Sequence, residues 1–280
     1  MKNKIIIVIG GTGGIGFEIC KMLFKKGYLT YLVGRDKKDA EKKAKVIDRN
    51  SDSVFFESLD VMNEDAVETI FKTIYKKHSS IYAVINLAGI FEPFGEFEKV
   101  NLTQHRKVVE VNLFGSFNIV HAILPFFKKQ NAGKIILFSG GGVGGDMPLL
   151  NASSYYVSKS AVSVFTEVLA KEIEKDNVQI NAVLPGQILT KSTKKTFKIS
   201  SEKLGPVLTA ATDNLMKTGG NSSAPVLALV EFLLSDKSNH VSGRTLSAKW
   251  DNLNLLEKDI SDERFKLRRI DGKVYKKVKP

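Results

Sequence analysis

Short apolar runs, rich in β-branched residues, alternate along most of this chain with longer segments of helical periodicity. The runs fall at Ile5–Ile9, 28–33, 54–59, Ala83–Asn86, 134–138 and Val178–Leu184. The first run is apolar at every position, which is typical of a strand buried on both faces. Crossovers between parallel strands are right-handed and carry helices. The alternation therefore predicts an α/β fold with a parallel sheet covered by helices on both faces.

The segments between these runs predict the helices. They are expected at 14–26, 36–49, after an Asn63 cap, and at 103–129, 154–175 and Ala224–Leu234, with a last strand at Arg244–Ser247. Residues 187–222 are rich in Thr, Ser and Lys and have weak periodicity, so we expect a mobile surface segment with a short helix near 206–216. We predict one domain over 1–248, in which 187–218 bind substrate. A charged tail outside the sheet is expected over 249–280.

Composition limits the class of protein. The chain has 280 residues, 43% of them hydrophobic, and one cysteine, Cys20. These values exclude a disordered chain and a disulfide framework. No apolar run is long enough for a membrane helix or a secretory signal, so we expect a cytoplasmic protein with no membrane partner. The four histidines lack metal-ligand spacing, and we expect no metal. The net charge of +12 comes with no nucleic-acid motif, so we interpret it as a solvated surface and expect no nucleic-acid partner.

A glycine-rich turn joins the first strand to the first helix. A turn of this kind at a helix N-terminus offers free N–H groups to a pyrophosphate. We expect Gly10 to permit the turn, Gly14 to admit the phosphates and Gly16 to pack the helix on the sheet. The spacing is one residue wider than the common dinucleotide fingerprint, and a merely tight turn is the alternative. The predicted cofactor contacts of the turn are Gly10, Thr12, Gly13, Gly14, Ile15 and Gly16.

Arg35 follows the second strand, where a dinucleotide site recognises the ribose. An acid at that place accepts the 2′-hydroxyl of NAD, whereas an arginine accommodates the 2′-phosphate of NADP. The sequence therefore favours NADP, with NAD as the alternative. Asp36 could pair with Arg35 or reach the ribose itself, and Arg35 could instead be a solvated surface residue.

Tyr155 and Lys159 are four positions apart at the start of a predicted helix, so they share one face. A phenol has a pKa near 10, and a neighbouring ammonium is expected to lower that pKa by stabilising the phenolate. Such a pair can act as a general acid or base. The same spacing also occurs in ordinary surface pairs.

The motifs together resemble the short-chain dehydrogenase/reductase family. They are the glycine turn, Asp60-Val61, Asn86-Leu87-Ala88-Gly89, Asn112, Ser139, Tyr155-x-x-x-Lys159 and Pro185-Gly186. Their order and spacing match that family over about residues 4–247. The resemblance implies a single Rossmann-like domain with a doubly wound, seven-stranded parallel sheet.

The resemblance also implies a role for each matching residue. The cofactor contacts would be Asp60 and Val61 at the adenine, Asn86, Ala88 and Gly89 at the ribose, and Pro185, Gly186, Ile188 and Thr190 at the nicotinamide. Tyr155 would protonate the carbonyl oxygen, and Lys159 would lower its pKa and hold the nicotinamide ribose. Asn112 would anchor a water that relays protons to Lys159.

The chain departs from the family pattern at the serine that hydrogen-bonds the substrate carbonyl. Ser139 lies sixteen residues before Tyr155, where about a dozen is usual, and Gly140 takes the usual place in one alignment. We expect Ser139 to serve, with the longer loop 140–145 allowing it to swing in. The alternatives are that no serine serves, or that Ser153 or Ser154 does, although both more simply cap the helix.

The resemblance implies an NAD(P)-dependent oxidoreductase, NADP preferred, that interconverts a ketone and a secondary alcohol. An epimerase without net cofactor turnover and a non-catalytic cofactor-binding regulator are the alternatives. The run Ser139-Gly140-Gly141-Gly142 together with the Trp250-Asp251 ending resembles short-chain reductases of bacterial cell-surface sugar pathways, which implies a sugar or nucleotide-sugar substrate; a packing role for Trp250 is the alternative. Four lysines beside the expected entrance would favour an anionic one, namely Lys191, Lys194, Lys195 and Lys198. A homodimer or homotetramer is implied by the resemblance.

Overall fold

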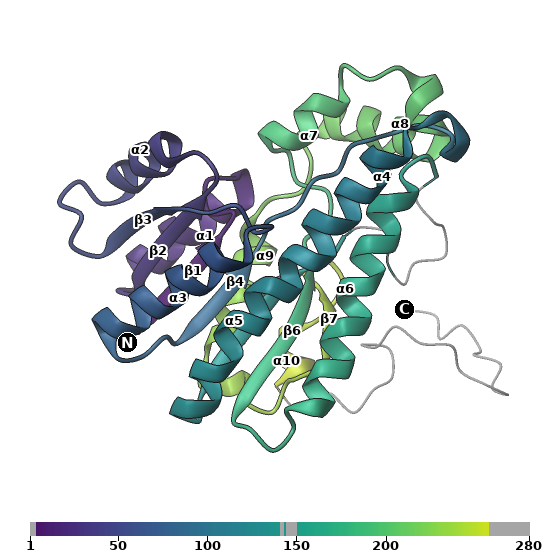
Figure 1. Cartoon of the computed structure of the whole chain (residues 1–280). Coiled ribbons are helices and arrows are strands. Elements are labelled where there is room, and N and C mark those ends of the chain that lie inside the picture. The colour runs from purple at the N-terminus through teal and green to yellow at the C-terminus, as the bar shows by residue number, and fades with distance from the viewer. Residues whose placement is uncertain (1–3, 141–142, 144–149, 258–280) are drawn as a thin grey trace, which may run out of the picture.

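A single seven-stranded parallel sheet forms the centre of the computed structural model, which describes residues 4–140, 143 and 150–257 (Figure 1). The strands are β1 (Ile5–Ile9), β2 (Leu29–Gly34), β3 (Val54–Ser58), β4 (Ala83–Asn86), β5 (Gly133–Phe138), β6 (Val178–Leu184) and β7 (Arg244–Ser247). Their order is β3-β2-β1-β4-β5-β6-β7. From β1 the chain adds strands toward one edge of the sheet as far as β3, and from β4 it adds strands toward the other edge. This reversal confirms the doubly wound α/β sheet that the sequence predicts.

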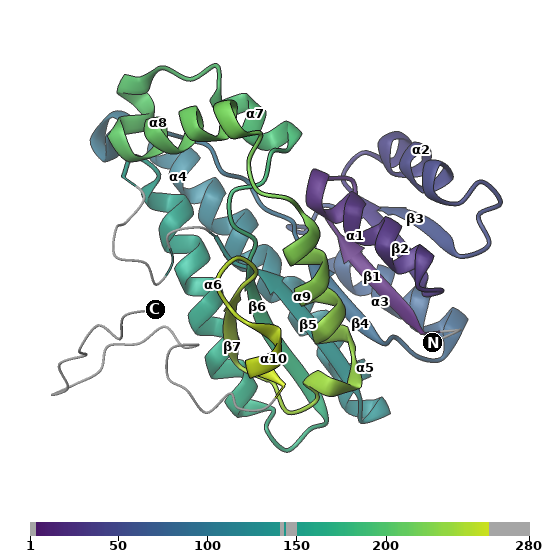
Figure 2. The same ribbon diagram turned by 180° about the vertical axis from the view of Figure 1, so that it is seen from behind.

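Helices cover both faces of this sheet (Figures 1 and 2). They are α1 (Gly14–Lys25), α2 (Lys37–Ile47), α3 (Glu64–His78), α4 (Leu102–Val109), α5 (Gly115–Gln130), α6 (Ser153–Glu172), α7 (Lys191–Thr196), α8 (Ser201–Thr218), α9 (Ala224–Leu234) and α10 (Leu253–Leu256). Shorter turns lie at Phe97–Lys99 and Asp236–Ser238. Helices α3, α5 and α6 share one core cluster, and α1, α2 and α9 share the other.

The side chains of β1 alternate between the two faces of the sheet, and both faces are covered, which explains why every residue of this strand is apolar. Ile5, Ile7 and Ile9 belong to the core under α3 and α5, whereas Ile6 and Val8 belong to the core under α1 and α9. All five side chains are buried. Because successive side chains of a strand point to opposite faces, only a strand covered on both sides needs this composition.

Helices α4 and α5 form one continuous run, Leu102–Gln130, through a π-helical segment at Glu110–Phe114. By length and mean hydropathy, 1.4, this run could cross a membrane. The side chains of Ile119, Ile123 and Phe127 are fully buried against the sheet, whereas Leu102 and Phe114 are exposed. Packing in the core of this domain therefore accounts for its composition.

Residues 187–222 contain more helix than the sequence predicts. Helix α8 is longer than the expected 206–216, and it bends at Gly205, where φ is +70°. Helix α7 was not predicted, because its sequence has no apolar periodicity. A reciprocal pair of bonds between Thr190 and Thr193 caps it instead. Both helices lie beyond the carboxyl ends of the strands (Figure 1).

The segment expected as a tail begins inside the packed structure. Ser247 N–H donates to Asp251 at 2.7 Å, and α10 places Leu256 in the core with α9. The rest of that expected tail, residues 258–280, lies outside the described residues, as does most of the loop 140–145.

Leu256 tests how far this segment contributes to stability. Leu256→Ala should lower the free energy of unfolding by about 2–4 kcal/mol, because the side chain is fully buried. Leu255 is 60% exposed, so Leu255→Ala should change the free energy of unfolding by less than about 0.5 kcal/mol. Urea denaturation followed by circular dichroism measures both. Equal values for the two variants would contradict the packing of α10.

Candidate active site

A cavity of about 470 Å³ lies at the carboxyl ends of the strands, between the glycine turn and α8. Thirteen of the predicted residues line it: Gly10, Gly13, Gly14, Ile15, Gly16, Gly89, Ser139, Tyr155, Lys159, Pro185, Gly186, Ile188 and Thr190. Parallel strands bring these segments together because their carboxyl ends meet at one edge. The cavity is therefore the candidate active site.

The glycine turn has the shape that a bound pyrophosphate needs. Gly10 has a φ of +79°, and a Cβ on Gly16 would lie 2.3 Å from the Gly10 carbonyl oxygen. Gly13 precedes α1 with no side-chain cap, and the first turn holds no acidic residue. The first N–H groups of α1 thus face the cavity without a carboxylate to compete for them. These residues fit a dinucleotide cofactor.

The end of β2 presents two cations near this turn. Arg35 is exposed, and no ion pair to it is found in the described part of the chain. Thr12 packs on Gly34, where a Cβ would meet its Cγ2 at 2.4 Å. Lys43 Nζ donates to the Thr12 carbonyl at 2.6 Å and to Asp39 at 2.6 Å. The ammonium of Lys43 therefore stands beside the end of β2.

Asp36 has a structural task. Its carboxylate accepts the Asp39 N–H at 3.1 Å and caps α2. In the described part of the chain Asp36 is not paired with Arg35, and its contact with the ribose stays a prediction.

Of the predicted adenine and ribose residues, Gly89 lines the cavity, whereas Asp60, Val61, Asn86 and Ala88 lie outside its lining. Asp60 accepts the Met62 N–H at 3.0 Å, and Val61 is buried against Gly115. Asn86 is buried, accepting from the Ala88 N–H at 3.0 Å and donating to Ser116 at 3.1 Å. Asn86 thus shapes the loop after β4 through local hydrogen bonds.

Tyr155 and Lys159 both pack on the backbone of Gly140. A Cβ at Gly140 would lie 2.8 Å from the Tyr155 hydroxyl and 2.9 Å from Lys159 Cγ. Lys159 Nζ donates to the Phe138 carbonyl at 2.8 Å. The first two turns of α6 therefore hold the two side chains together at the end of β5, as their spacing predicts.

Burial sets the protonation of this pair. Desolvation raises the pKa of Tyr155 to about 12 and lowers the pKa of Lys159 to about 8. Desolvation is the dominant effect on the pKa of Tyr155, and the Lys159 ammonium donates to the Phe138 carbonyl, so the lowering of that pKa by Lys159 stays a prediction. Tyr155 consequently keeps its proton throughout the neutral range.

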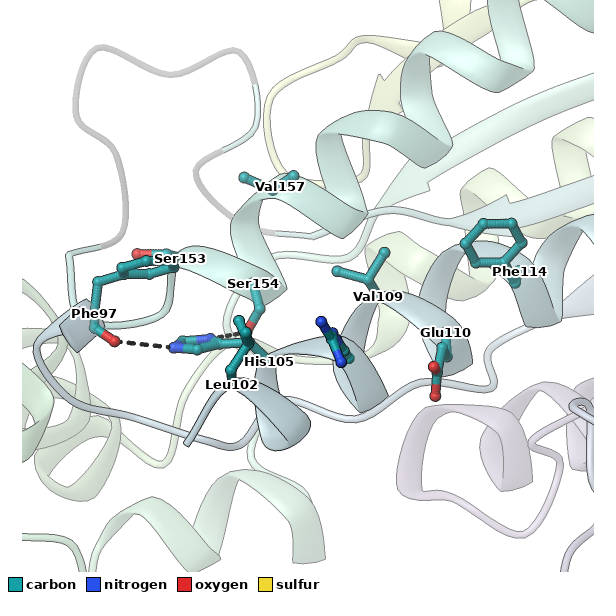
Figure 3. Close-up of a pocket in the computed structure, with 10 residues that line it drawn as sticks. Phe97, Leu102, His105, Val109, Glu110, Phe114, Ser153, Ser154 and Val157 are labelled. Atoms are coloured by element: carbon teal, nitrogen blue, oxygen red, sulfur yellow. Dashed lines mark hydrogen bonds between the residues drawn. The ribbon is translucent and has the colours of Figure 1, made fainter. Parts of the chain in front are cut away.

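Ser139 does not point toward the Tyr155 hydroxyl. Its buried hydroxyl donates to the Lys159 carbonyl at 2.8 Å and lies 2.9 Å from Ser163 Oγ. The direction of these bonds is against the expected polarising role of Ser139. Ser154 pairs with His105 at 3.1 Å (Figure 3). Gly140, not a serine, faces Tyr155.

Asn112 lies within the π-helical segment, close to Lys159. Its amide oxygen accepts a hydrogen bond from the Ile90 N–H at 2.8 Å. Its amide nitrogen donates to the Ile90 carbonyl at 3.0 Å and to the Ser158 hydroxyl at 3.0 Å. A Cβ on Gly89 would meet Asn112 Oδ1 at 3.0 Å and Lys159 Nζ at 3.2 Å. Gly89 therefore keeps open the space between the two groups, where the resemblance implies a relay water.

A second groove, of about 400 Å³, runs along the outer sides of α4 and α6 (Figure 3). Phe97 and Val157, which are 60% and 59% exposed, belong to its lining. The resemblance implies pairing of two chains through these helices, and that pairing stays a prediction. Within the described residues, no group of His, Cys, Asp and Glu side chains could hold a metal ion.

The sequence analysis did not name several residues that line the cavity. They are Leu87, Ile90, Phe91, Phe94, Phe138, Gln187, Thr193, Thr196, Leu204, Leu208, Ala211, Thr212 and Leu215. The sequence did predict that 187–218 bind substrate, but weak periodicity hid which side chains face inward. Phe91 and Phe94 carried a signal, because two aromatic residues follow the Asn86–Gly89 motif directly.

Comparison with known proteins agrees with this geometry. The short chain dehydrogenase family matches residues 4–200, which is well over half of the chain. This chain belongs to the short-chain dehydrogenase family. It is 28% identical over 196 residues to an uncharacterized oxidoreductase of Staphylococcus epidermidis, covering 70% of this chain and 83% of that one. It is 29% identical over 192 residues to acetoacetyl-CoA reductase of Acinetobacter, covering 68% and 76%.

Solved structures of this family have the same fold. Levodione reductase is 24% identical with a TM-score of 0.77, covering 88% of this chain and 96% of that chain. ElxO with NADP bound is 25% identical with a TM-score of 0.75, covering 89% and 97%. The chain is thus an oxidoreductase of the short-chain dehydrogenase family, and its relatives support a nicotinamide cofactor.

Removal of the Ser139 hydroxyl separates a packing role from a catalytic one. Ser139→Ala should lower the free energy of unfolding by about 1–3 kcal/mol, because it leaves buried partners on α6 unsatisfied. Turnover at saturating substrate should stay within about threefold, since the hydroxyl does not face Tyr155. Chemical denaturation and steady-state rates measure the two effects. A large loss of turnover with intact stability would restore Ser139 to the polarising role.

Proposed function

We propose that this protein is an NADP(H)-dependent oxidoreductase that interconverts a ketone and a secondary alcohol. The observation that carries the proposal is the contact of Tyr155 and Lys159 with Gly140 in the cavity that begins at the glycine turn. One end of the cavity fits a dinucleotide, and the other offers a protonated phenol. Carbonyl reduction needs both.

The proposed reaction uses a hydride that a bound dihydronicotinamide supplies to the carbonyl carbon. Tyr155 donates its proton to the carbonyl oxygen, so the ketone is reduced to an alcohol and the nicotinamide is oxidised. The raised pKa of Tyr155 keeps it a proton donor at neutral pH. Lys159, with its pKa lowered to about 8, can return a proton to the phenolate. Asn112 holds the polar space beside Lys159.

The preference for NADP rests on Arg35 and Lys43. A 2′-phosphate at the end of β2 would meet an arginine that no acid among the described residues pairs with, and an ammonium already held at the turn by Thr12. Phosphate is bound well by such charge-assisted donors. Asp39 partly offsets the charge of Lys43.

The phenol of Tyr155 provides the first test. Tyr155→Phe should lower the rate of ketone-dependent NADPH oxidation by at least about a hundredfold, since it removes the proton donor and little else. The affinity for NADPH should persist. Tyr156→Phe is the matched control on the same helical turn and should leave the rate near that of the parent protein.

Other outcomes would favour the remaining functions. Product formed without net NADPH oxidation would favour an epimerase. Cofactor binding without turnover across a broad substrate panel would favour a regulator. An unchanged rate in Tyr155→Phe would remove this residue from the mechanism.

Lys43 provides a test of cofactor preference. Lys43→Met should weaken NADPH binding about ten- to hundredfold, since a hydrogen bond to a charged group contributes roughly 1.5–3 kcal/mol. NADH binding should change little, and Arg35→Ala should have the same pattern. Calorimetry or nicotinamide fluorescence measures the dissociation constants without any turnover.

Two variants of α2 serve as controls for Lys43. Lys45 is 58% exposed and paired with Glu41, so Lys45→Met should leave both affinities unchanged. Asp39→Asn frees Lys43 from its ion pair and should strengthen NADPH binding. Equal losses for NADPH and NADH in Lys43→Met would show that Lys43 only supports the turn.

A further inference from the structure

We infer that the substrate end of the cavity takes a ketone whose larger substituent is apolar and uncharged. This inference rests on the proposed function, because it places a carbonyl at Tyr155. It differs from the sugar and anionic substrates that the sequence suggested. The side chains around Tyr155 and the placement of the nearby lysines carry the argument.

An aromatic and aliphatic wall surrounds Tyr155. The Phe91 ring packs edge-on against two other rings. Its centroid lies 4.4 Å from that of Tyr155 and 4.6 Å from that of Phe94. Phe94, Leu204 and Leu208 are buried in one apolar cluster that also contacts Tyr155. A substituent beside the reacting carbonyl would therefore contact carbon atoms from the loop after β4 and from α8. Burial of apolar surface there favours binding in proportion to the area removed from water.

Polar side chains are outnumbered by apolar ones in the lining, and several of the polar ones are already bonded within the protein. Among the lining residues that the structure describes, Lys159 is the only charged one. The Thr193 hydroxyl donates to the Ile188 carbonyl at 3.1 Å, and the Thr196 hydroxyl donates to the Thr193 carbonyl at 2.6 Å. The several hydroxyl groups of a sugar would lose their bonds to water and find too few replacements.

The lysines near the expected entrance do not enter the cavity. Lys191, Lys194, Lys195 and Lys198 are all exposed, and none of them lines the cavity. Thr196 is buried on the side of α7 that faces inward. An anionic group in the cavity would thus be dehydrated without a lysine of α7 to contact it, which is unfavourable.

The wall is held in place by a polar contact. Asn151 donates to the Lys203 carbonyl at 3.1 Å, and its amide contacts Gly205 at the bend of α8. Gly95 N–H donates to the Asn151 carbonyl at 2.9 Å. One residue therefore joins the loop that carries Phe91 and Phe94 to the helix that carries Leu204 and Leu208. The apolar surface is organised before a substrate binds.

The experiment is a homologous series of methyl n-alkyl ketones, assayed with the full chain and NADPH. Each added methylene should raise kcat/KM about fourfold until the cavity is full, which is the fold-change for burial of one methylene. A polyhydroxylated ketone and a phosphorylated ketone of equal carbon number should react more slowly than the alkyl ketone. A flat series, or faster reaction of either polar ketone, would overturn the inference.

Two variants test whether the apolar side chains around Tyr155 cause the dependence of kcat/KM on alkyl chain length. Leu208→Asn should reduce the gain per methylene to below about twofold, because it places an amide where the chain binds. The combined Lys194→Ala and Lys195→Ala variant should leave the gain unchanged. Thermal unfolding of each variant shows whether the fold persists, and Leu208→Ala supplies a milder change if Leu208→Asn does not fold.

Calorimetric binding of the same ketones distinguishes this inference from the proposed function. Affinity that rises along the series without any NADPH oxidation would support the apolar wall and contradict the proposed reaction. NADPH oxidation with no dependence on chain length would support the reaction and contradict the wall. Neither binding nor oxidation would contradict both.

Discussion

The contact of Gly16 with the carbonyl of Gly10 is the constraint on which the cavity depends. Any larger residue at position 16 would push α1 away from β1, since a Cβ there would lie 2.3 Å from that oxygen. The same turn places Thr12 against Gly34 and Gly14 against Thr190, whose Cγ2 would meet a Cβ on Gly14 at 2.8 Å. The cofactor end, the end of β2 and the start of α7 are thus positioned through one backbone turn.

Burial is the dominant effect at the other end of the cavity. It raises the pKa of Tyr155 and lowers the pKa of Lys159, so both changes favour the uncharged forms. A phenol that stays protonated suits carbonyl reduction, whereas a phenolate would suit alcohol oxidation. A cofactor in the cavity would change these surroundings, because the Lys159 ammonium could leave the Phe138 carbonyl for a ribose hydroxyl.

Residues whose neighbours are local in sequence were predictable, and residues positioned by distant segments were not. The strands followed from apolar runs, the Asn63 cap from its spacing to Ala66, and the Tyr155–Lys159 contact from helical geometry. Lys43 was missed because its role depends on Thr12, thirty-one residues away. The direction of the Ser139 hydroxyl depends on Ser163, twenty-four residues away. Helix α7 is an exception, because its cap between Thr190 and Thr193 is local but its sequence has no apolar periodicity. None of these contacts leaves a periodic signal.

Gly140 explains how the proposed acid is held without a neighbouring serine. The space that a side chain would fill at this position is taken by the Tyr155 hydroxyl and by the aliphatic stem of Lys159. An added hydroxyl would have to displace the acid before it could polarise a carbonyl. Tyr155 is instead supported by the backbone of Gly140 on one side and by the Phe91 ring on the other. Under the proposed function, the carbonyl oxygen would then receive its hydrogen bond from Tyr155, and the apolar wall would strengthen that bond by excluding water.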